Sequence, residues 1–200
     1  SAHPLDPFRV AVEYGADCSI AEKNAMTQPM QSLAIAGMIM EVNERTTRAG
    51  GSMTIVKIED FSGSTDFAVF ERQMAGLGGL LVPGTPVMVY GQLKTDRNGA
   101  LRFNVEKVRR LAELHGRLFR TLNIILEPSQ ADTVAALLEM PVKDGSEVEP
   151  VDVVITVHDP GLQRKLTFNT TAKVHPTAEF VRNLRHAEVA FRLERSRQAM

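Results

Sequence analysis

Residues 86–108 read PVMVYGQLKTDRNGALRFNVEKV, and this stretch decides the fold of the chain around it. Apolar and polar residues alternate on both sides of Asn98-Gly99, which indicates two β-strands. The Asn-Gly pair predicts a type I′ turn between them, because that turn needs a positive φ at both positions. Alternation places Phe103 and Val105 on the inner face of the second strand. The stretch therefore predicts an antiparallel hairpin.

Three more strands are expected before this hairpin. The first is an apolar run, 33–42, in which Gly37 predicts a β-bulge. The second and third are expected at 53–59 and 64–70, and a short helical or irregular segment, 71–81, separates them from the hairpin. Five strands with an insertion between the third and fourth predict an OB-fold barrel. Closure into a barrel would also remove the open edges of the sheet.

The chain is expected to contain two domains after a connector. Residues 1–30 are interrupted by prolines and show no sustained periodicity, so they are predicted to be a connector from a preceding domain. The OB-fold domain is expected at 31–113. The segment 114–200 predicts a C-terminal α/β domain of split βαβ type, with 163–171 as a core strand. The predicted fold class is therefore β plus α+β, a five-stranded OB-fold barrel followed by a small two-layer β-α-β-β-α-β domain.

Composition excludes several classes of protein. The net charge is −1, from 23 Lys and Arg against 24 Asp and Glu, so any nucleic-acid site must be a local patch. No apolar stretch approaches the roughly 20 residues of a membrane-spanning helix, so no membrane partner is expected. The single cysteine, Cys18, fits a reducing cytoplasm. The histidines form no metal-ligand pattern, and no phosphate-binding loop or serine hydrolase motif is present, so neither a catalytic nor a metal site is predicted.

The charge of the C-terminal domain is divided along the chain. Residues 127–159 contain one basic residue and eight acidic ones, whereas 164–197 contain eight basic residues and three acidic ones. A continuous track for phosphates is not expected from this arrangement. A polarised surface suits docking of a protein, because complementary potentials orient a partner.

The candidate nucleic-acid site is the surface of the barrel. OB folds bind nucleic acid across their second and third strands, between the loops that join strands one to two and four to five. Cations from both loops and the face between them, with one outward ring, are the predicted contacts: Arg45, Arg48, Lys57, Phe70, Lys94, Arg97 and Arg102. Asp66 also points outward and would repel phosphate. We expect micromolar or weaker affinity for single strands, with little base preference.

Seven stretches carry a resemblance to a known family: Ser1–Asp6, Ala36-Gly37, Arg45–Gly51, Ile58–Ser64, Val69-Phe70, Val174–Pro176 and Val189–Glu194. They resemble the C-terminal part of the bacterial DNA polymerase III alpha subunit. The resemblance implies a fragment without an active site or cofactor, because the polymerase palm with its Mg²⁺-binding aspartates lies upstream in that family. It also implies that the OB domain contacts single-stranded template and that the C-terminal domain docks the clamp-loader tau subunit. Other replisome subunits would be reached through the parent, a DNA-directed DNA polymerase of the cytoplasm.

Three other functions remain open from the residues. A tRNA-binding OB module, as in aminoacyl-tRNA synthetases, would prefer structured RNA to single-stranded DNA. A purely protein-docking module would bind no nucleic acid even at low salt. A small hydrolase would need a nucleophile beside a base, and no such pair is evident in the sequence.

Overall fold

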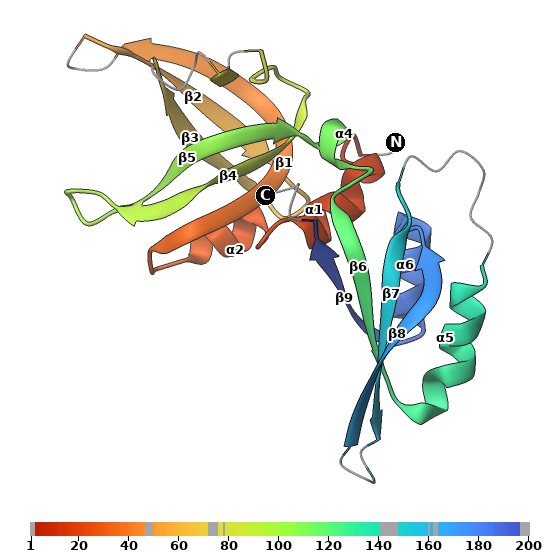
Figure 1. The fold of residues 1–200 in the computed structure, drawn as a ribbon. Coiled ribbons are helices and arrows are strands. Elements are labelled where there is room, and N and C mark those ends of the chain that lie inside the picture. Colours follow the sequence, from red (N-terminus) through yellow and green to blue (C-terminus); the bar gives the residue numbers. More distant parts are fainter. Residues whose placement is uncertain are drawn as a thin grey trace. The chain divides into compact units, whose positions relative to one another are not determined.

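The computed structural model describes residues 3–46, 50–71, 76–77, 79–140, 148–159, 161 and 164–196 (Figure 1). The chain divides into two compact units, Ser1–Glu113 and Leu114–Met200. A short helix, α4 (Leu111–Leu114), follows the last strand of the first unit. One predicted contact residue, Arg48, lies outside the described residues.

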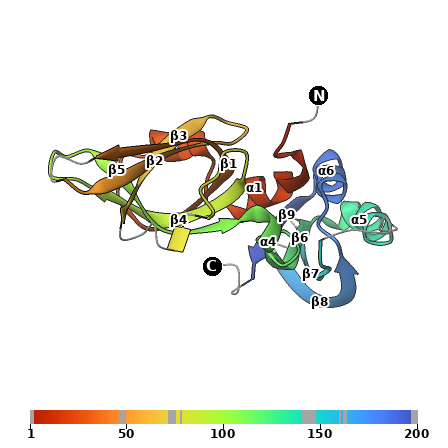
Figure 2. The same ribbon diagram turned by 90° about the horizontal axis from the view of Figure 1, so that it is seen from above.

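Five strands close into a barrel in the first unit, and Figure 2 shows them surrounding its interior. They are β1 (Met30–Thr46), β2 (Ser52–Glu59), β3 (Ser64–Phe70), β4 (Pro86–Thr95) and β5 (Leu101–Arg110). Their order is β1-β2-β3-β5-β4, and every neighbouring pair is antiparallel except β3 and β5, which are parallel. The predicted five-stranded OB-fold barrel is confirmed.

Alternating apolar side chains fill the barrel. Val56 and Ile58 of β2 point inward, and so do Phe103 and Val105 of β5, as the alternation predicted. Each buried side chain of this size contributes about 1.5–3 kcal/mol through the apolar surface it removes from water. The outward positions between them are therefore free to carry the polar side chains of a surface site.

The long strand β1 pairs with β4 through its first half and with β2 through its second half. The predicted bulge at Gly37 is wrong in position, because the register with β2 shifts between Ile39 and Glu41, at Met40. At Gly37 the two backbones instead approach closely: a Cβ there would lie 2.7 Å from the carbonyl oxygen of Glu59. The glycine is required by this approach, and the bulge follows it.

Three short helices precede the barrel, where the sequence predicted a connector. They are η1 (Asp6–Phe8), α1 (Arg9–Gly15) and α2 (Ile20–Ala25). α1 contacts β1, and the side chain of Ile20 belongs to the barrel core. The prediction missed these helices because α1 has 7 residues and α2 has 6, too few for a helical period to show.

A buried carboxylate attaches α2 to the turn between β2 and β3. Asp60 is 5% exposed, and its Oδ2 accepts a hydrogen bond from the Ile20 N–H over 2.8 Å. Its Oδ1 accepts hydrogen bonds from the N–H groups of Ser62, at 2.7 Å, and Gly63, at 3.0 Å. Buried carboxylates persist where backbone donors satisfy them in this way. The segment before β1 is therefore an integral part of the first unit.

The connection between β3 and β4 is described only in part. Residues 76–77 are helical, and Leu77 and Leu81 belong to the barrel core. Within the predicted helical or irregular segment, 71–81, residues 72–75 and 78 lie outside the described residues. The described part places two of its leucines inside the barrel.

The second unit has the predicted element order β-α-β-β-α-β. Its elements are β6 (Phe119–Leu126), η2 (Pro128–Gln130), α5 (Ala131–Leu138), β7 (Val151–Asp159), β8 (Arg164–Val174), α6 (Ala178–His186) and β9 (Ala190–Arg195). The sheet order is β8-β7-β6-β9, with β6 and β7 as parallel neighbours. The predicted split βαβ type holds for β8-α6-β9, whose parallel strands are separated by β7 and β6, but it does not hold for β6-α5-β7, whose strands are adjacent.

Both helices of the second unit cover one face of its sheet. α5 contacts α6 and β8, and α6 contacts β9. Phe180, Val181 and Leu184 of α6 are buried, as are Leu122 and Ile124 of β6. The predicted two-layer architecture is confirmed. Of the helices that the structure describes, none combines the length and the apolar character that crossing a membrane requires.

The strand β8 lies at one edge of this sheet and pairs with β7. Two of its apolar side chains face solvent: Leu166 is 58% exposed and Phe168 is 50% exposed. The prediction of a core strand at 163–171 is therefore wrong for these residues, and Gln163 lies outside the described residues. The alternation of apolar and polar residues predicted a strand correctly. Alternation does not show whether a second layer of structure covers that strand.

Candidate nucleic-acid interface

Strand register arranges the outer face of the barrel in rows of side chains. Arg45 of β1 lies opposite Met53 of β2, which lies opposite Phe70 of β3. Residues directly opposite each other in antiparallel strands point to the same face. These three side chains therefore form one row across the sheet, and the ring of Phe70 is 50% exposed in it. This position suits the stacking role that the sequence predicted for Phe70.

A neighbouring row consists of charged side chains of alternating sign. Lys57 of β2 lies opposite Glu41 of β1 on one side and Asp66 of β3 on the other. Its Nζ is 3.7 Å from Glu41 Oε1. Two carboxylates thus offset the charge of Lys57, which makes it a poorer phosphate contact than the sequence alone suggested.

The hairpin between β4 and β5 has a three-residue loop. The N–H of Asp96 donates to the carbonyl of Ala100 over 2.8 Å. The φ of Gly99 is 81°, whereas Asn98 has no positive φ. The predicted hairpin is confirmed, but the predicted type I′ turn is wrong. A glycine in the left-handed region at the end of a three-residue loop is typical of hairpins in which a type I turn is followed by a G1 bulge.

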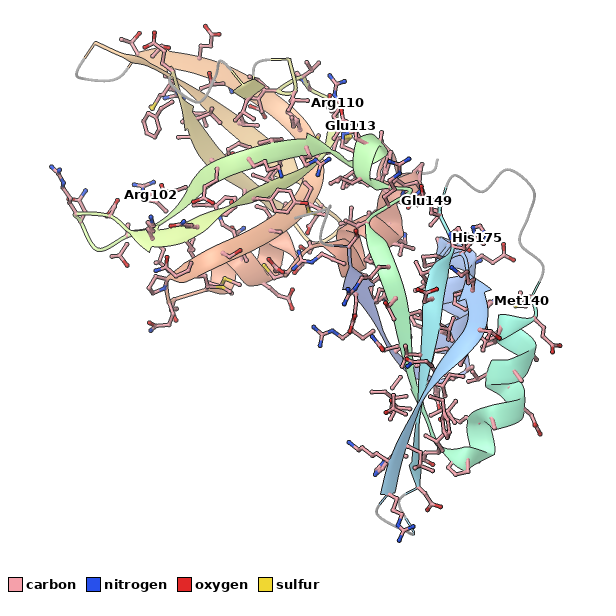
Figure 3. All side chains as sticks on the ribbon, viewed as in Figure 1. Arg102, Arg110, Glu113, Met140, Glu149 and His175 are labelled. Carbon is pink, nitrogen blue, oxygen red and sulfur yellow. The ribbon has the colours of Figure 1, made fainter. Side chains whose placement is uncertain are left out.

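An ion pair holds one of the predicted contact residues on this hairpin. Arg102 Nε donates to Asp96 Oδ2 over 3.1 Å, and Figure 3 labels Arg102 beside the hairpin. The Arg102 guanidinium, and then the N–H groups of Ala100 and Asn98, lower the pKa of the Asp96 carboxyl below its ordinary value. Asp96 is therefore ionised at neutral pH, and part of the Arg102 charge is already compensated.

Three of the predicted cations have no acidic partner in the described part of the chain: Arg45, Lys94 and Arg97. All three are exposed. Arg45 lies near the end of β1, and the other two belong to the β4–β5 hairpin, whose tip lies apart from that end of β1 in Figure 1. The face is thus flanked by available positive charge on two sides.

A groove of about 360 Å³ opens on the same face. Residues of three strands line it: Met53 and Ile55 of β2, Asp66, Phe67, Ala68 and Phe70 of β3, and Arg102, Phe103 and Asn104 of β5. It lies where β3 and β5 meet through a single residue pair, Ala68 and Asn104. Its volume is at the lower end of the range of about 300–1,000 Å³ typical of ligand pockets.

The sequence did not identify the groove, although it placed some of its residues on the outer face. Alternation with inward neighbours marks Ile55 and Asn104 as outward positions. Only the parallel contact of β3 with β5 brings them together, and that contact is made when the barrel closes. The available signal was therefore the barrel topology combined with the alternation, rather than any local motif.

Two further observations concern side chains that could bind a metal ion or act as a nucleophile. No group of three or more His, Cys, Asp or Glu side chains that could hold a metal ion occurs among the described residues. Burial, followed by the nearby carboxylates of Glu22, Asp17 and Asp60, raises the pKa of the Cys18 thiol to about 11. The thiol is therefore protonated at neutral pH, which makes it a poor nucleophile.

Comparison with known proteins identifies relatives of both units. Residues 33–111 match the family described as the OB-fold nucleic acid binding domain. DNA polymerase III subunit alpha of Vibrio cholerae is 24% identical over 178 residues, which cover 88% of this chain and 15% of that protein. The chain is similar in sequence to bacterial DNA polymerase III alpha subunits. The alpha subunit of Pseudomonas fluorescens is 22% identical and covers 92% of the chain, and that of Deinococcus radiodurans is 25% identical and covers 62%.

The chain spans only 10% to 16% of the length of these DNA polymerase III alpha relatives. The resemblance predicted from the sequence is confirmed by them. Among solved structures, the mitochondrial single-stranded DNA binding protein Rim1 of S. cerevisiae has a TM-score of 0.34 and 20% identity, and it covers 41% of this chain and 94% of its own.

Proposed function

We propose that this chain is the C-terminal part of a replicative DNA polymerase alpha subunit and that its barrel contacts single-stranded template DNA. The observation that carries the proposal is the groove beside the exposed Phe70 ring, flanked by Arg45 on one side and by Lys94 and Arg97 on the other. A flexible strand crossing this face would place phosphates on the cations and a base on the ring. The match to the OB-fold nucleic acid binding domain supports this assignment.

The contact with DNA is weak by itself. Two of the predicted cations, Lys57 and Arg102, are paired with Glu41 and Asp96, so fewer charges are available for phosphates. One exposed ring adds about 1–3 kcal/mol of stacking. Affinity is therefore micromolar or weaker. In the whole polymerase such weakness is tolerable, because tethering to other DNA-binding parts raises the effective concentration of the template.

Fluorescence anisotropy tests the nature of the nucleic acid. We expect a labelled single-stranded DNA of 20 nucleotides to bind more tightly than the matching duplex or an RNA hairpin in 50 mM salt. The duplex is disfavoured because its stacked bases cannot reach the Phe70 ring. Tighter binding of the RNA hairpin would contradict the proposal and favour a tRNA-binding module. If none of the three binds even at low salt, a purely protein-docking module is the better assignment.

The second unit docks the clamp-loader tau subunit in this proposal. Two observations support a protein partner there: the exposed Leu166 and Phe168 on β8, and the division of the chain into an acidic part, 127–159, and a basic part, 164–197. Exposed apolar side chains on one strand are typical of the centre of a protein interface, and separated charges orient the partner.

The double variant Leu166→Thr with Phe168→Thr tests this docking. We expect its affinity for purified tau subunit to fall at least tenfold in surface plasmon resonance, whereas its DNA affinity stays unchanged. Ile125→Thr is the matched control, because Ile125 is also exposed and its register partner Thr156 marks the opposite face of the sheet. Full tau binding by the double variant, or equal loss in the control, would contradict the assignment.

Nucleotide transfer belongs to other parts of the whole protein in this proposal. DNA polymerisation needs carboxylates that hold two metal ions close together. We therefore assign Mg²⁺ to the polymerase domain of the parent and no polymerase active site to this chain. As part of a replisome, the parent would work in the cytoplasm with the other replication subunits.

A further inference from the structure

The groove on the barrel has an apolar floor, and three aromatic side chains, Phe67, Phe70 and Phe103, are part of its lining. Met53, Ile55 and Ala68 form the floor, and Phe70 stands at one side with its ring half exposed. The small side chain of Ala68 lies at the single residue pair that joins β3 to β5, which leaves room for a flat group above it. Flat aromatic groups bind such sites by stacking and by removing apolar surface from water.

Three polar side chains line the rim of the groove, and they differ in whether they already have a partner within the protein. Arg102 is held by Asp96 at 3.1 Å. Asp66 and Asn104 form no side-chain hydrogen bond to any residue that the structure describes. Their acceptor and donor groups are therefore open to a ligand in the groove. A carboxylate only accepts hydrogen bonds when ionised, and an amide both donates and accepts.

A phosphate does not fit this groove. Asp66 would repel it, and the nearest cation is already paired. A base matches the floor and the ring, and its polar edge would reach the rim. Phosphates of the same strand would lie outward, toward Arg45 on one side and the β4–β5 hairpin on the other.

We propose that the groove seats one unpaired base that carries an exocyclic amino group, which donates a hydrogen bond to the Asp66 carboxylate. This inference rests on the proposed binding of single-stranded DNA. Cytosine, adenine and guanine have such an amino group, whereas the only ring donor of an unpaired thymine is its N3–H, which lies between two carbonyl oxygens. A carboxylate that accepts from the thymine N3–H lies beside both carbonyl oxygens, and their repulsion disfavours thymine relative to a base with an amino group. The barrel thus has a base preference, which differs from the little preference that the sequence predicted.

Two pyrimidine oligonucleotides test the proposal, because they are matched in ring size. We expect the chain to bind (dC)12 about tenfold more tightly than (dT)12 in anisotropy competition at pH 7.5. Asp66→Asn provides an amide that donates to thymine as well as accepting from cytosine, so the ratio should fall to about twofold or less. The overall affinity of this variant should rise, because one negative charge is removed from the face.

Glu44→Gln is the control with the same change of charge. Glu44 is exposed and lies opposite Thr54, whose side chain is buried inside the barrel, so Glu44 does not share the face of Arg45. We expect this variant to keep the tenfold ratio. Equal binding of the two oligonucleotides by the unaltered chain, or an unchanged ratio in Asp66→Asn, would overturn the base seat and leave the DNA interface in place. Absence of binding to either oligonucleotide would overturn both proposals.

Discussion

Replacing Arg45, Lys94 and Arg97 together with alanine is expected to lower the affinity for single-stranded DNA several hundredfold at 50 mM salt. Each neutralised phosphate of a single strand changes the slope of log affinity against log salt by about 0.7. With 1 M salt as reference, one contact is then worth about eightfold at 50 mM, and three contacts multiply to roughly 500-fold. The slope itself should flatten by about 2. An anisotropy series from 50 to 300 mM salt measures both quantities.

A charge-matched control separates this local effect from a general loss of positive charge. Arg164, Lys165 and Arg182 are exposed residues of the second unit, and replacing them with alanine removes the same charge. We expect the affinity of that variant for DNA to change by less than about threefold, since these residues lie outside the proposed interface. If the two triple variants behaved alike, the DNA would not follow the barrel face.

Gly91→Ala is expected to destabilise the first unit by about 3 kcal/mol, at the upper end of the usual cost of overpacking. A Cβ on Gly91 would overlap the carbonyl oxygen of Asn104 and lie 3.1 Å from Phe103 Cε2. The obstacle is the backbone of the paired strand β5, which cannot rotate away as a side chain can. Since Asn104 also lines the groove, the variant should lose DNA affinity together with stability.

Tyrosine fluorescence measures this effect selectively during urea unfolding. The chain has two tyrosines and no tryptophan, and both Tyr14 and Tyr90 belong to the first unit. The midpoint should fall by roughly 1–3 M urea, given slopes of about 1–3 kcal/mol/M for domains of this size. Gly63→Ala is the control, because a Cβ there would meet nothing within 4 Å and the φ of Gly63 is not positive. A midpoint for Gly91→Ala equal to that of the control would contradict the close approach of β4 and β5.

Much of the barrel was predictable because its strands follow local rules. The alternation around Val56 and Phe103 and the turn residues Asn98-Gly99 report strands and hairpins within a few residues of chain. The helices before β1 were not predictable in the same way. α2 is defined by a hydrogen bond from Ile20 to Asp60, 40 residues later, and no local pattern contains that information.

The positions of the candidate contacts were predictable, but their electrostatic state was not. Lys57 and Arg102 were placed correctly on the outer face, yet their partners follow from register and hairpin geometry. Glu41 reaches Lys57 across two strands, and Asp96 reaches Arg102 across a loop. The same limit applies to the second unit, where the element order was predictable from the sequence and the sheet order was not, because pairing of β6 with β7 depends on tertiary packing.

The two pairings of β1 have a consequence for how the barrel is made on the ribosome. The first half of β1 pairs with β4. The parallel pairing of β3 with β5 forms only after Asn104 has been synthesised. The first half of β1 therefore stays without its partner strand until β4 has been synthesised, and its main-chain groups form no strand hydrogen bonds there until then. Such non-local closure is slow compared with helix formation. During synthesis the nascent strands remain open to pairing with other chains, and a holding chaperone has its clearest opportunity in that interval.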